Sequence, residues 1–249
     1  MSAEIVVREF RNVQLGGGTI VEAIPSVGLV STIAATYLIS ALELDQVAAI
    51  DSDEFPPLSM IYSSKPKFPA RVYASESKKL AVFICEIPLP NHLHRPLART
   101  LMSWAAEHGA KRIVGFEGLA LPKGASREDV QVWAVGSTDA ARDMIAAHKM
   151  NSLEGGMITG VTGVLLNEGR WTNTDMIALV AEARTEIPDA FAAAKLVEGL
   201  DLLMPEFEVD LVPLLEQAKS LESQLLELRK MAVPVSTPPR RTDADRAYG

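Results

Sequence analysis

The residue types best suited to metal binding lie close together in the first half of the chain. Cys85 and Glu86 precede a His-x-His pair formed by His92 and His94. Such a pair can ligate zinc when it lies on a strand, because alternate side chains then share a face. Here the pair lies directly before a predicted helix, and no third ligand has a recognisable spacing. We therefore predict a polar loop or helix cap at this point and no metal site.

A glycine-rich segment, EGGMITGVTGVLLNEG (154–169), is the best candidate for a ligand site. Its glycines and threonines could present backbone amides to an anion at a helix start. The alternative, which we favour, is a tight strand-to-helix turn whose glycines let backbones approach closely. Another candidate, in GFEGLAL, is a carboxylate at a strand end, where ligands of α/β proteins often bind. The candidate pocket residues are Glu117, Gly155, Gly156, Thr159, Gly160 and Gly163.

The common catalytic motifs are missing from the sequence. It contains no GxSxG elbow, no GxxxxGK[ST] phosphate loop and no GxGxxG fingerprint. Cys85 lies in an apolar run, where a thiol is usually inert packing. Glu117 has no identifiable carboxylate partner in the sequence, so it gives little support to acid–base catalysis. We predict a protein that is not an enzyme and needs no cofactor.

The elements that must position these residues alternate between strands and helices. The run LAVFICEI (80–87) is continuously apolar, which is typical of a strand buried on both faces. This alternation predicts an α/β fold with a mostly parallel sheet covered by helices on both faces. Two N-terminal strands, 4–15 and 19–24, are expected to be joined by a glycine turn at 16–18. The remaining predicted strands are 46–50, 58–63, 70–75, 112–118, 130–136 and 177–183, and the predicted helices are 28–43 (Ser26 as N-cap), 95–110, 138–149 (Ser137 or Thr138 as cap) and 188–204.

Composition narrows the classes of partner and compartment. The chain has 249 residues, a net charge of −8 and one cysteine. The acidic balance argues against a general nucleic-acid binder, and the single cysteine fits a reducing compartment. Residues 23–42 carry no charge, but their serines, threonines, proline and glycine favour a buried helix over a membrane span. We predict a soluble cytoplasmic protein that binds neither nucleic acid nor membrane.

The C-terminal part of the chain has a different pattern. Apolar residues recur there at alternating spacings of three and four, which predicts a helix with a heptad seam. Two interpretations stay open, namely packing on the helix's own domain or pairing with a neighbouring subunit. The predicted organisation is an α/β domain over 1–205, this helix over 206–232 and a proline-containing flexible tail over 233–249. The seam consists of Leu211, Leu214, Ala218, Leu221, Leu225 and Leu228, and continues to Ala232.

Several segments together resemble the proteasome assembly chaperone family, whose members occur in archaea and actinobacteria. These segments are PSVGLVSTIAATYLISAL, FEGLAL, GGMITGVTGVLLNEG and PDAFAAAKLVEGLDLLM, and the resemblance spans about residues 5–205. It implies a three-layer α/β/α sandwich similar to purine nucleoside phosphorylases, usually without their catalytic residues. It also implies assembly into homo-oligomers.

The same resemblance implies a role for the chain end. Family members often finish in a hydrophobic–Tyr–any-residue motif, called HbYX, which docks between α-subunits of the proteasome core particle. In this sequence Ala247 takes the hydrophobic position, Tyr248 the tyrosine and Gly249 the free terminus. A terminal carboxylate can be captured by a lysine or by backbone amides, and a tyrosine adds an aromatic anchor. Alanine has a small side chain for the hydrophobic position of the motif, so Ala247 is where this sequence departs from the family pattern.

We predict a homo-oligomeric chaperone or adaptor that engages the proteasome core particle through its C-termini. One alternative is a nucleoside- or carboxylate-handling enzyme that uses Glu117 and the glycine-rich loop. The other is a structural oligomer with an inert tail.

Overall fold

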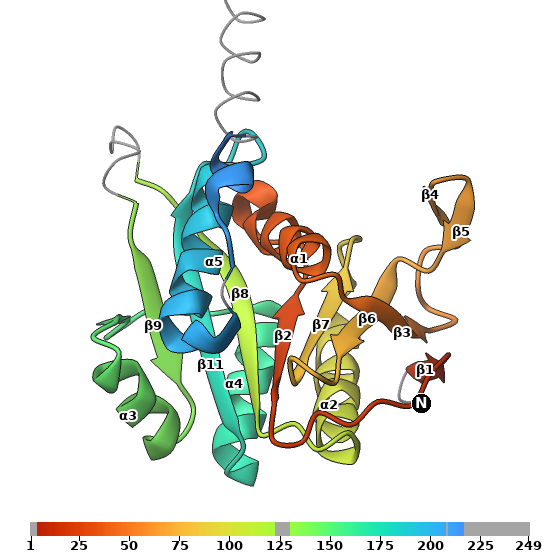
Figure 1. The fold of residues 1–249 in the computed structure, drawn as a ribbon, viewed down its shortest axis with the longest axis horizontal. Coiled ribbons are helices and arrows are strands. Elements are labelled where there is room, and N and C mark those ends of the chain that lie inside the picture. The colour runs from red at the N-terminus through yellow and green to blue at the C-terminus, as the bar shows by residue number, and fades with distance from the viewer. Residues whose placement is uncertain (1–3, 123–129, 208, 217–249) are drawn as a thin grey trace, which may run out of the picture.

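The fold is built on one nine-stranded sheet. The computed structural model describes residues 4–122, 130–207 and 209–216. Across the sheet the strands follow the order β1-β3-β6-β7-β2-β8-β11-β9-β10 (Figure 1). Since parallel strands end at the same edge, the middle of the sheet presents one edge of carboxyl ends. The four parallel middle strands are β7 (Leu80–Cys85), β2 (Thr19–Ala23), β8 (Arg112–Ala120) and β11 (Asp175–Ala183).

The flanks of the sheet correct the prediction of a mostly parallel sheet. Four of its eight pairings are antiparallel, namely β1–β3, β3–β6, β6–β7 and β9–β11. A short turn joins β6 to β7, and a short connection permits only antiparallel pairing. The flanking strands are β1 (Val6–Glu9), β3 (Asp45–Asp51), β6 (Ala70–Ser75), β9 (Val132–Gly136) and β10 (Asn151–Ser152).

The two N-terminal strands are joined by a glycine turn, as predicted, but they do not pair with each other, and the first is shorter than the predicted 4–15. β1 pairs with β3 at one edge, whereas β2 lies between β7 and β8 in the middle of the sheet. Every residue of β2 is buried, so this strand needs a neighbour on both sides and a helix layer on both faces. The glycines do form a turn, because Gly16 and Gly17 have φ of 52° and 82°. A Cβ on Gly18 would lie 1.9 Å from the carbonyl oxygen of Lys79.

Helices cover both faces of the sheet, which confirms the predicted three-layer α/β/α architecture. In Figure 1 helices lie both in front of the sheet and behind it. The front helices contact each other, and so do the helices at the back. A fifth helix, α3 (Asp139–Ala147), packs beside β9 and is capped by the hydroxyl of Thr138, as predicted. The front pair is α1 (Val30–Ala41) and α5 (Ala190–Leu203), and the back pair is α2 (Asn91–Glu107) and α4 (Gly160–Thr172).

The uncharged stretch of residues 23–42 forms a short helix within the front layer. The predicted helix 28–43 begins only at Val30, because Gly28 and Leu29 have left-handed φ angles of 64° and 52°. A 3₁₀ turn, η1 (Val27–Leu29), precedes it, and the hydroxyl of Ser26 contacts that of Ser31 rather than capping a backbone amide. Within the described part of the chain, every helix is too short or too polar to cross a membrane.

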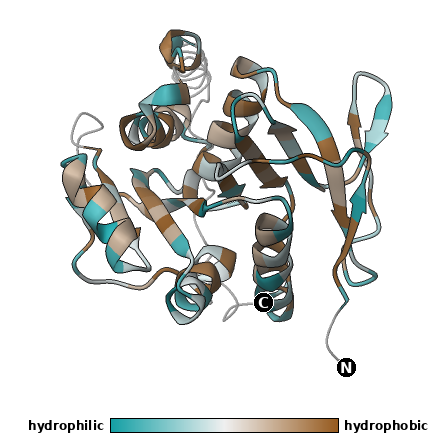
Figure 2. Cartoon of the chain, turned by 60° about the horizontal axis from the view of Figure 1, so that its bottom comes forward, coloured by the Kyte–Doolittle hydropathy of each residue, from teal (hydrophilic) through white to brown (hydrophobic). Residues whose placement is uncertain are grey.

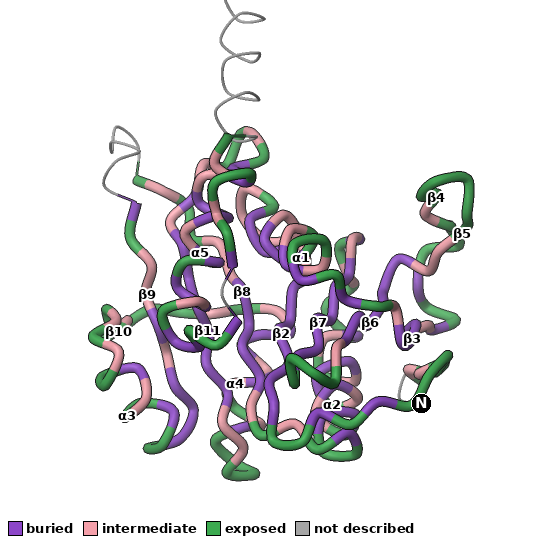
Figure 3. The backbone as a smooth tube through the Cα atoms, in the orientation of Figure 1, coloured by how far each residue is buried: buried purple, intermediate pink, exposed green. Residues whose placement is uncertain are grey.

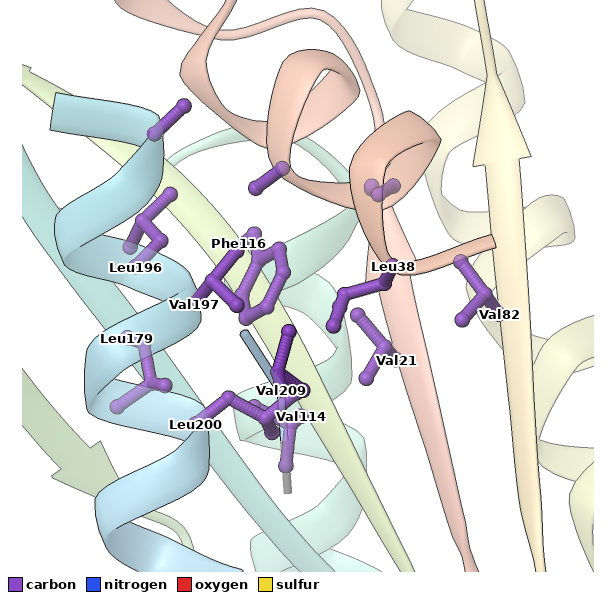
Figure 4. Packing of buried hydrophobic residues seen from close by; sticks show 14 of the residues in the cluster. Val21, Leu38, Val82, Val114, Phe116, Leu179, Leu196, Val197, Leu200 and Val209 are labelled. Atoms are coloured by element: carbon purple, nitrogen blue, oxygen red, sulfur yellow. The ribbon is translucent and has the colours of Figure 1, made fainter. Parts of the chain in front are cut away.

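Two hydrophobic cores lie between the three layers, one on each face of the sheet. Figures 2 and 3 show that the middle strands are largely hydrophobic and buried. The front core joins the sheet to α1 and α5 (Figure 4), and the back core joins it to α2 and α4. Residues of the front core include Val21, Leu38, Phe116, Leu196, Val197 and Leu200. Residues of the back core include Ile20, Phe83, Leu97, Leu101, Ile113 and Leu165.

Two segments extend from these layers. A small hairpin of β4 (Met60–Tyr62) and β5 (Lys65–Lys67) projects from the body beside β6 (Figure 1). Towards the end of the described residues, η3 (Pro205–Phe207) follows α5, and residues 212–216 are helical. Phe207, Val209 and Leu214 are buried in the front core.

Candidate functional site

The residues considered for metal binding have separate partners. His92 lies exposed in the first turn of α2, with Nε2 2.5 Å from Oε2 of Glu54. Nε2 of His94 lies 3.1 Å from the carbonyl oxygen of Leu89. Cys85 is fully buried in β7, and this burial raises the pKa of its thiol to about 12. The described residues contain no group of three ligands that could hold a metal ion.

Glu117 has a carboxylate partner that the sequence analysis missed. In the parallel pair of β2 and β8, Glu22 is aligned with Gly115. Glu117 lies two residues beyond Gly115, and alternation along the strand puts its side chain on the same face as that of Glu22. The Oγ1 of Thr162, in the first turn of α4, lies 2.9 Å from Oε2 of Glu22. Thr162 also hydrogen-bonds the side chain of Glu117, so its hydroxyl links the two carboxyl groups.

Both carboxyl groups hold their protons more tightly than an exposed glutamate. Burial, and secondly the charge of Glu117, raise the pKa of Glu22 from 4.5 to about 8. Burial raises the pKa of Glu117 to about 7, while hydrogen bonds from Thr162 and from the backbone of Gly118 lower it. At neutral pH Glu22 is therefore mainly protonated and Glu117 is close to its midpoint. The pair is stable in the sheet as an acid and its partner carboxylate, not as two adjacent charges.

Glycine at position 115 makes room for this pair. A Cβ at Gly115 would lie 2.6 Å from Cγ2 of Thr162 and 2.9 Å from Oε2 of Glu22. Both distances are shorter than a van der Waals contact, so a side chain here would displace the carboxyl group or the helix start. Gly118 has a related role, because its Cβ would lie 2.4 Å from the carbonyl oxygen of Val27. The two glycines of VGFEGL thus let η1 and α4 approach β8 closely.

A cavity opens in front of Glu117 at the carboxyl ends of β2 and β8. Its volume is about 620 Å³, and the starts of α2 and α4 complete its walls. We call it the Glu117 pocket. Ligand sites of α/β sheets usually occupy this position. Its lining includes Pro25, Val27, Leu89, His94, Glu117 and Thr159.

The glycine-rich loop contributes to two cavities rather than to one anion cradle. Thr159 and Gly160 line the Glu117 pocket, while Gly155 and Gly156 line an adjoining cavity of about 130 Å³ that Glu117 also borders. Gly163 lines neither cavity, since its Cβ would lie 2.3 Å from the carbonyl oxygen of Ile158.

Backbone geometry gives the loop a structural role as well. Gly156 and Gly160 have φ of 141° and 70°, conformations that side-chain-bearing residues rarely adopt. This geometry supports the turn interpretation of the loop. An anion at the start of α4 would also lie beside the carboxyl group of Glu117.

Only the first two residues of the predicted seam lie among the described residues. Leu214 is buried against the front core of its own chain, and Leu211 packs against the same core half-buried. The hydroxyl of Tyr37 donates a hydrogen bond to the carbonyl oxygen of Asp210, which holds this segment on α1. The remaining seam residues, Ala218, Leu221, Leu225 and Leu228, and the chain end, Ala247, Tyr248 and Gly249, lie outside the described residues.

Glu22 could have been recognised in the sequence as a candidate site residue from its apolar neighbours. The segment TIVEAI places one carboxylate inside an otherwise apolar strand. Burial of an unpaired charge is costly, so a charged residue within a buried strand indicates a compensating partner or a functional site. The partner, however, lies 95 positions further along the chain, and no local pattern connects Glu22 with Glu117.

Comparisons with known proteins agree with the fold. Pyrococcus furiosus PbaA, described as an archaeal homolog of proteasome-assembly chaperone, is 27% identical with a TM-score of 0.83, covering 91% of this chain and 92% of that chain. Pyrococcus furiosus PbaB, described as an archaeal proteasome activator, shares the fold at 23% identity with a TM-score of 0.76, covering 92% and 100%. Neither description names an enzyme.

Sequence comparisons identify the family. An uncharacterized protein of Methanocaldococcus jannaschii is 24% identical over 222 residues, which cover 89% of this chain and 90% of that protein. Residues 20–229 match the model of the PAC2 family, and together with the structural match to PbaA this confirms the resemblance predicted from the sequence. Since the match covers most of its length, the chain belongs to the PAC2 family.

Proposed function

We propose that this chain is a homo-oligomeric assembly chaperone or adaptor of the proteasome core particle. It binds in pockets between the α-subunits of the core particle through Ala247, Tyr248 and Gly249 at its C-terminus. The observation that carries the proposal is the match to PbaA, because it combines 27% identity with coverage of about nine-tenths of both chains. The fold shared with PbaB, described as a proteasome activator, adds support.

The residues that lead into the C-terminal segment are packed on the folded body. Phe207 and Leu214 are buried in the front core, and Tyr37 holds the backbone at Asp210. Because Leu214 packs within its own chain, we propose that contacts between subunits come from the later seam residues Leu221, Leu225 and Leu228. Several C-termini of one oligomer then reach the same core particle.

The chemistry of the last residues suits a docking role. The terminal carboxylate is a fixed negative charge that a pocket lysine can bind, and Tyr248 adds aromatic contact area and a hydroxyl group. The 17 residues from 233 to 249 span at most about 55–60 Å when extended, so the motif can reach beyond the folded body. Each end binds weakly, and several ends on one oligomer increase the avidity through their effective concentration.

The direct test is co-sedimentation or pull-down with the purified core particle. We expect the full chain to bind, and a chain lacking Tyr248 and Gly249 to lose at least about tenfold in affinity, because both the aromatic anchor and the native position of the carboxylate are gone. Tyr248→Ala is expected to have a similar effect, and Ala247→Leu to strengthen binding through added apolar contact.

The controls separate docking from folding and assembly. The truncated chain is expected to keep the melting temperature and the oligomeric state of the full chain, since the removed residues follow the last described core residue, Leu214, by more than 30 positions in the sequence. Undiminished core-particle binding by the truncated chain would contradict the docking role.

Oligomerisation has its own test, the mass of the free protein by analytical ultracentrifugation. We expect the full chain to be an oligomer and the triple change of Leu221, Leu225 and Leu228 to glutamate to give monomers, because charges in a heptad seam repel. A monomeric full chain would overturn this part of the proposal.

A further inference from the structure

We propose that the Glu117 pocket binds a small organic cation, with an ammonium or guanidinium head on a short apolar body. This site is independent of the C-terminal motif and lies within the folded body of the chain. The cation's head would contact the carboxyl group of Glu117, and its body would lie against the apolar part of the wall.

The shape and lining of the pocket suit such a ligand. At about 620 Å³ it falls in the size range of small-molecule sites. Its lining combines apolar residues, namely Ile24, Pro25, Val27 and Leu89, with the polar side chains of Glu117 and Thr159. Apolar walls with a few converging polar groups bind the body of a ligand by burial and fix its head by hydrogen bonds.

The charges of the lining favour a cation over an anion. Glu117 is the one acidic residue among the described lining residues, and none of them is lysine or arginine. His94, the remaining titratable residue of the lining, lies against the carbonyl oxygen of Leu89. The nearby Arg95 forms an ion pair with Glu168 on α4, outside the lining. An anionic ligand would therefore meet a carboxylate without a compensating cationic side chain.

Glu22 provides a second observation that indicates a ligand. It is fully buried behind Thr162, and its Oε1 has no hydrogen-bond partner among the described residues. Its other oxygen, Oε2, is linked through the hydroxyl of Thr162 to Glu117. A buried carboxyl oxygen without a partner costs free energy, and such a group is explained by a functional role or by a bound water or ion.

The two carboxyl groups allow the pocket to offer a single negative charge. With Glu22 protonated, its Oε2 still accepts the hydrogen bond from the hydroxyl of Thr162, and Glu117 alone carries a negative charge. Binding of a cation then favours the ionised form of Glu117, whose proton leaves to solvent. Besides Glu117, the lining carries one titratable residue, His94. Cys85 interacts with Glu22 rather than with Glu117, and burial raises the pKa of its thiol to about 12.

The test compares three ligands of one size by calorimetric titration of the full-length protein: butylammonium, butanol and butyrate. We expect saturable binding of butylammonium and none of butanol or butyrate. Because ionisation of Glu117 rises around pH 7, binding is expected to be roughly tenfold tighter at about pH 8 than at about pH 6. Butylguanidinium is the second cationic probe.

Three variants identify the site. Glu117→Gln is expected to abolish butylammonium binding while keeping the fold, because an amide has the shape of the protonated acid. Glu22→Gln is expected to retain it within about twofold, since Glu22 is mainly neutral at these pH values. Glu182→Gln, at a half-buried carboxylate of β11 outside the lining, is the matched control and is expected to bind like the unchanged protein.

Butyrate binding in place of butylammonium would overturn the proposal and indicate an anion site at the start of α4. Absence of any butylammonium or butylguanidinium binding, or binding that Glu117→Gln leaves unchanged, would also overturn it. Core-particle binding is expected to be the same for Glu117→Gln and the unchanged chain, so failure of either proposal leaves the other standing.

Discussion

The two faces of the central sheet differ in what they bury. Towards α1 and α5 the sheet presents apolar side chains such as Val21, Val114 and Phe116, and that core continues to Leu214. Towards α2 and α4 the same strands present Glu22 and Glu117, linked by Thr162. The middle strands thus carry a largely apolar face towards α1 and α5, whereas their other face contains a polar site. Stability and the proposed binding chemistry therefore depend on opposite faces of the sheet, and four predictions test this separation.

The largest effect is expected for Phe116→Ala on the apolar face. Phe116 is fully buried, so its truncation should cost about 3–5 kcal/mol in free energy of unfolding through lost burial and a residual cavity. Urea denaturation measures this loss. Trp171→Ala is the matched control, because Trp171 is 87% exposed and its truncation should change stability by less than about 0.5 kcal/mol. Equal losses for the two aromatic residues would contradict the assignment of the core.

The polar face should dominate the pH dependence of stability. Folding raises the pKa of Glu22 from 4.5 to about 8, so the folded state binds this proton more tightly than the unfolded state. The stabilisation is complete below about pH 4.5 and is lost as the pH rises through about 8. Glu22→Gln removes this loss, because glutamine stays neutral.

We therefore expect Glu22→Gln to gain stability over the unchanged protein as the pH rises from about 5 to about 9. At about 1.4 kcal/mol for each pKa unit, the gain is on the order of 4 kcal/mol. Urea denaturation at both pH values measures it. Glu182→Gln serves as the control and should show no comparable gain. A constant stability difference between Glu22→Gln and the unchanged protein at both pH values would contradict the buried carboxyl pair.

A smaller effect is expected for Gly115→Ala, which adds a methyl group between the carboxyl pair and α4. The new Cβ would lie 2.6 Å from Cγ2 of Thr162, so we expect a loss of about 1–3 kcal/mol from overpacking. Gly155→Ala is the matched control, since no heavy atom lies within 4 Å of its Cβ position. Thermal unfolding of the two variants measures the difference in stability. Equal stability of the two variants would contradict the close packing of α4 against β8 at Gly115.

The smallest effect is expected for Tyr37→Phe, on α1, where the front layer contacts the segment that follows α5. This change removes the hydrogen bond to the carbonyl oxygen of Asp210 and leaves the aromatic ring, at a cost of about 0.5–1.5 kcal/mol. Hydrogen exchange of the amides around Leu214 should become faster while that of β2 is unchanged. Faster exchange throughout the body would instead indicate a general loss of packing.

Local patterns predicted most elements of the fold. The strand at 80–87 was recognisable because all of Leu80–Cys85 is apolar and buried on both faces. The helix at 138–149 was recognisable because the Thr138 hydroxyl caps its first turn. Such signals act within a few residues, so they are visible in the sequence. The predicted start of the first helix was wrong, because the left-handed backbone angles of Gly28 and Leu29 delay the start of α1.

Strand pairing was not predictable from the same patterns. The glycine turn between the first two strands is a local signal, but it does not reveal that β2 pairs with β7 and β8 rather than with β1. A hydrophobic pattern reports that a strand is buried but not which strands flank it. The candidate site depended on this pairing, because Glu22 meets Glu117 only when β2 and β8 are neighbours.

By itself, the sequence determined the chemistry that the chain carries and the class of its fold. A glutamate within TIVEAI, another within GFEGLAL and a glycine-rich helix start are local features, as are the alternating strands and helices and the tyrosine next to the C-terminus. Only the tertiary structure decided that Glu22 and Glu117 share one threonine and that α4 closes a cavity beside them. The physical reason is that pKa shifts and cavities arise from groups far apart in the chain, which the topology of the sheet brings together.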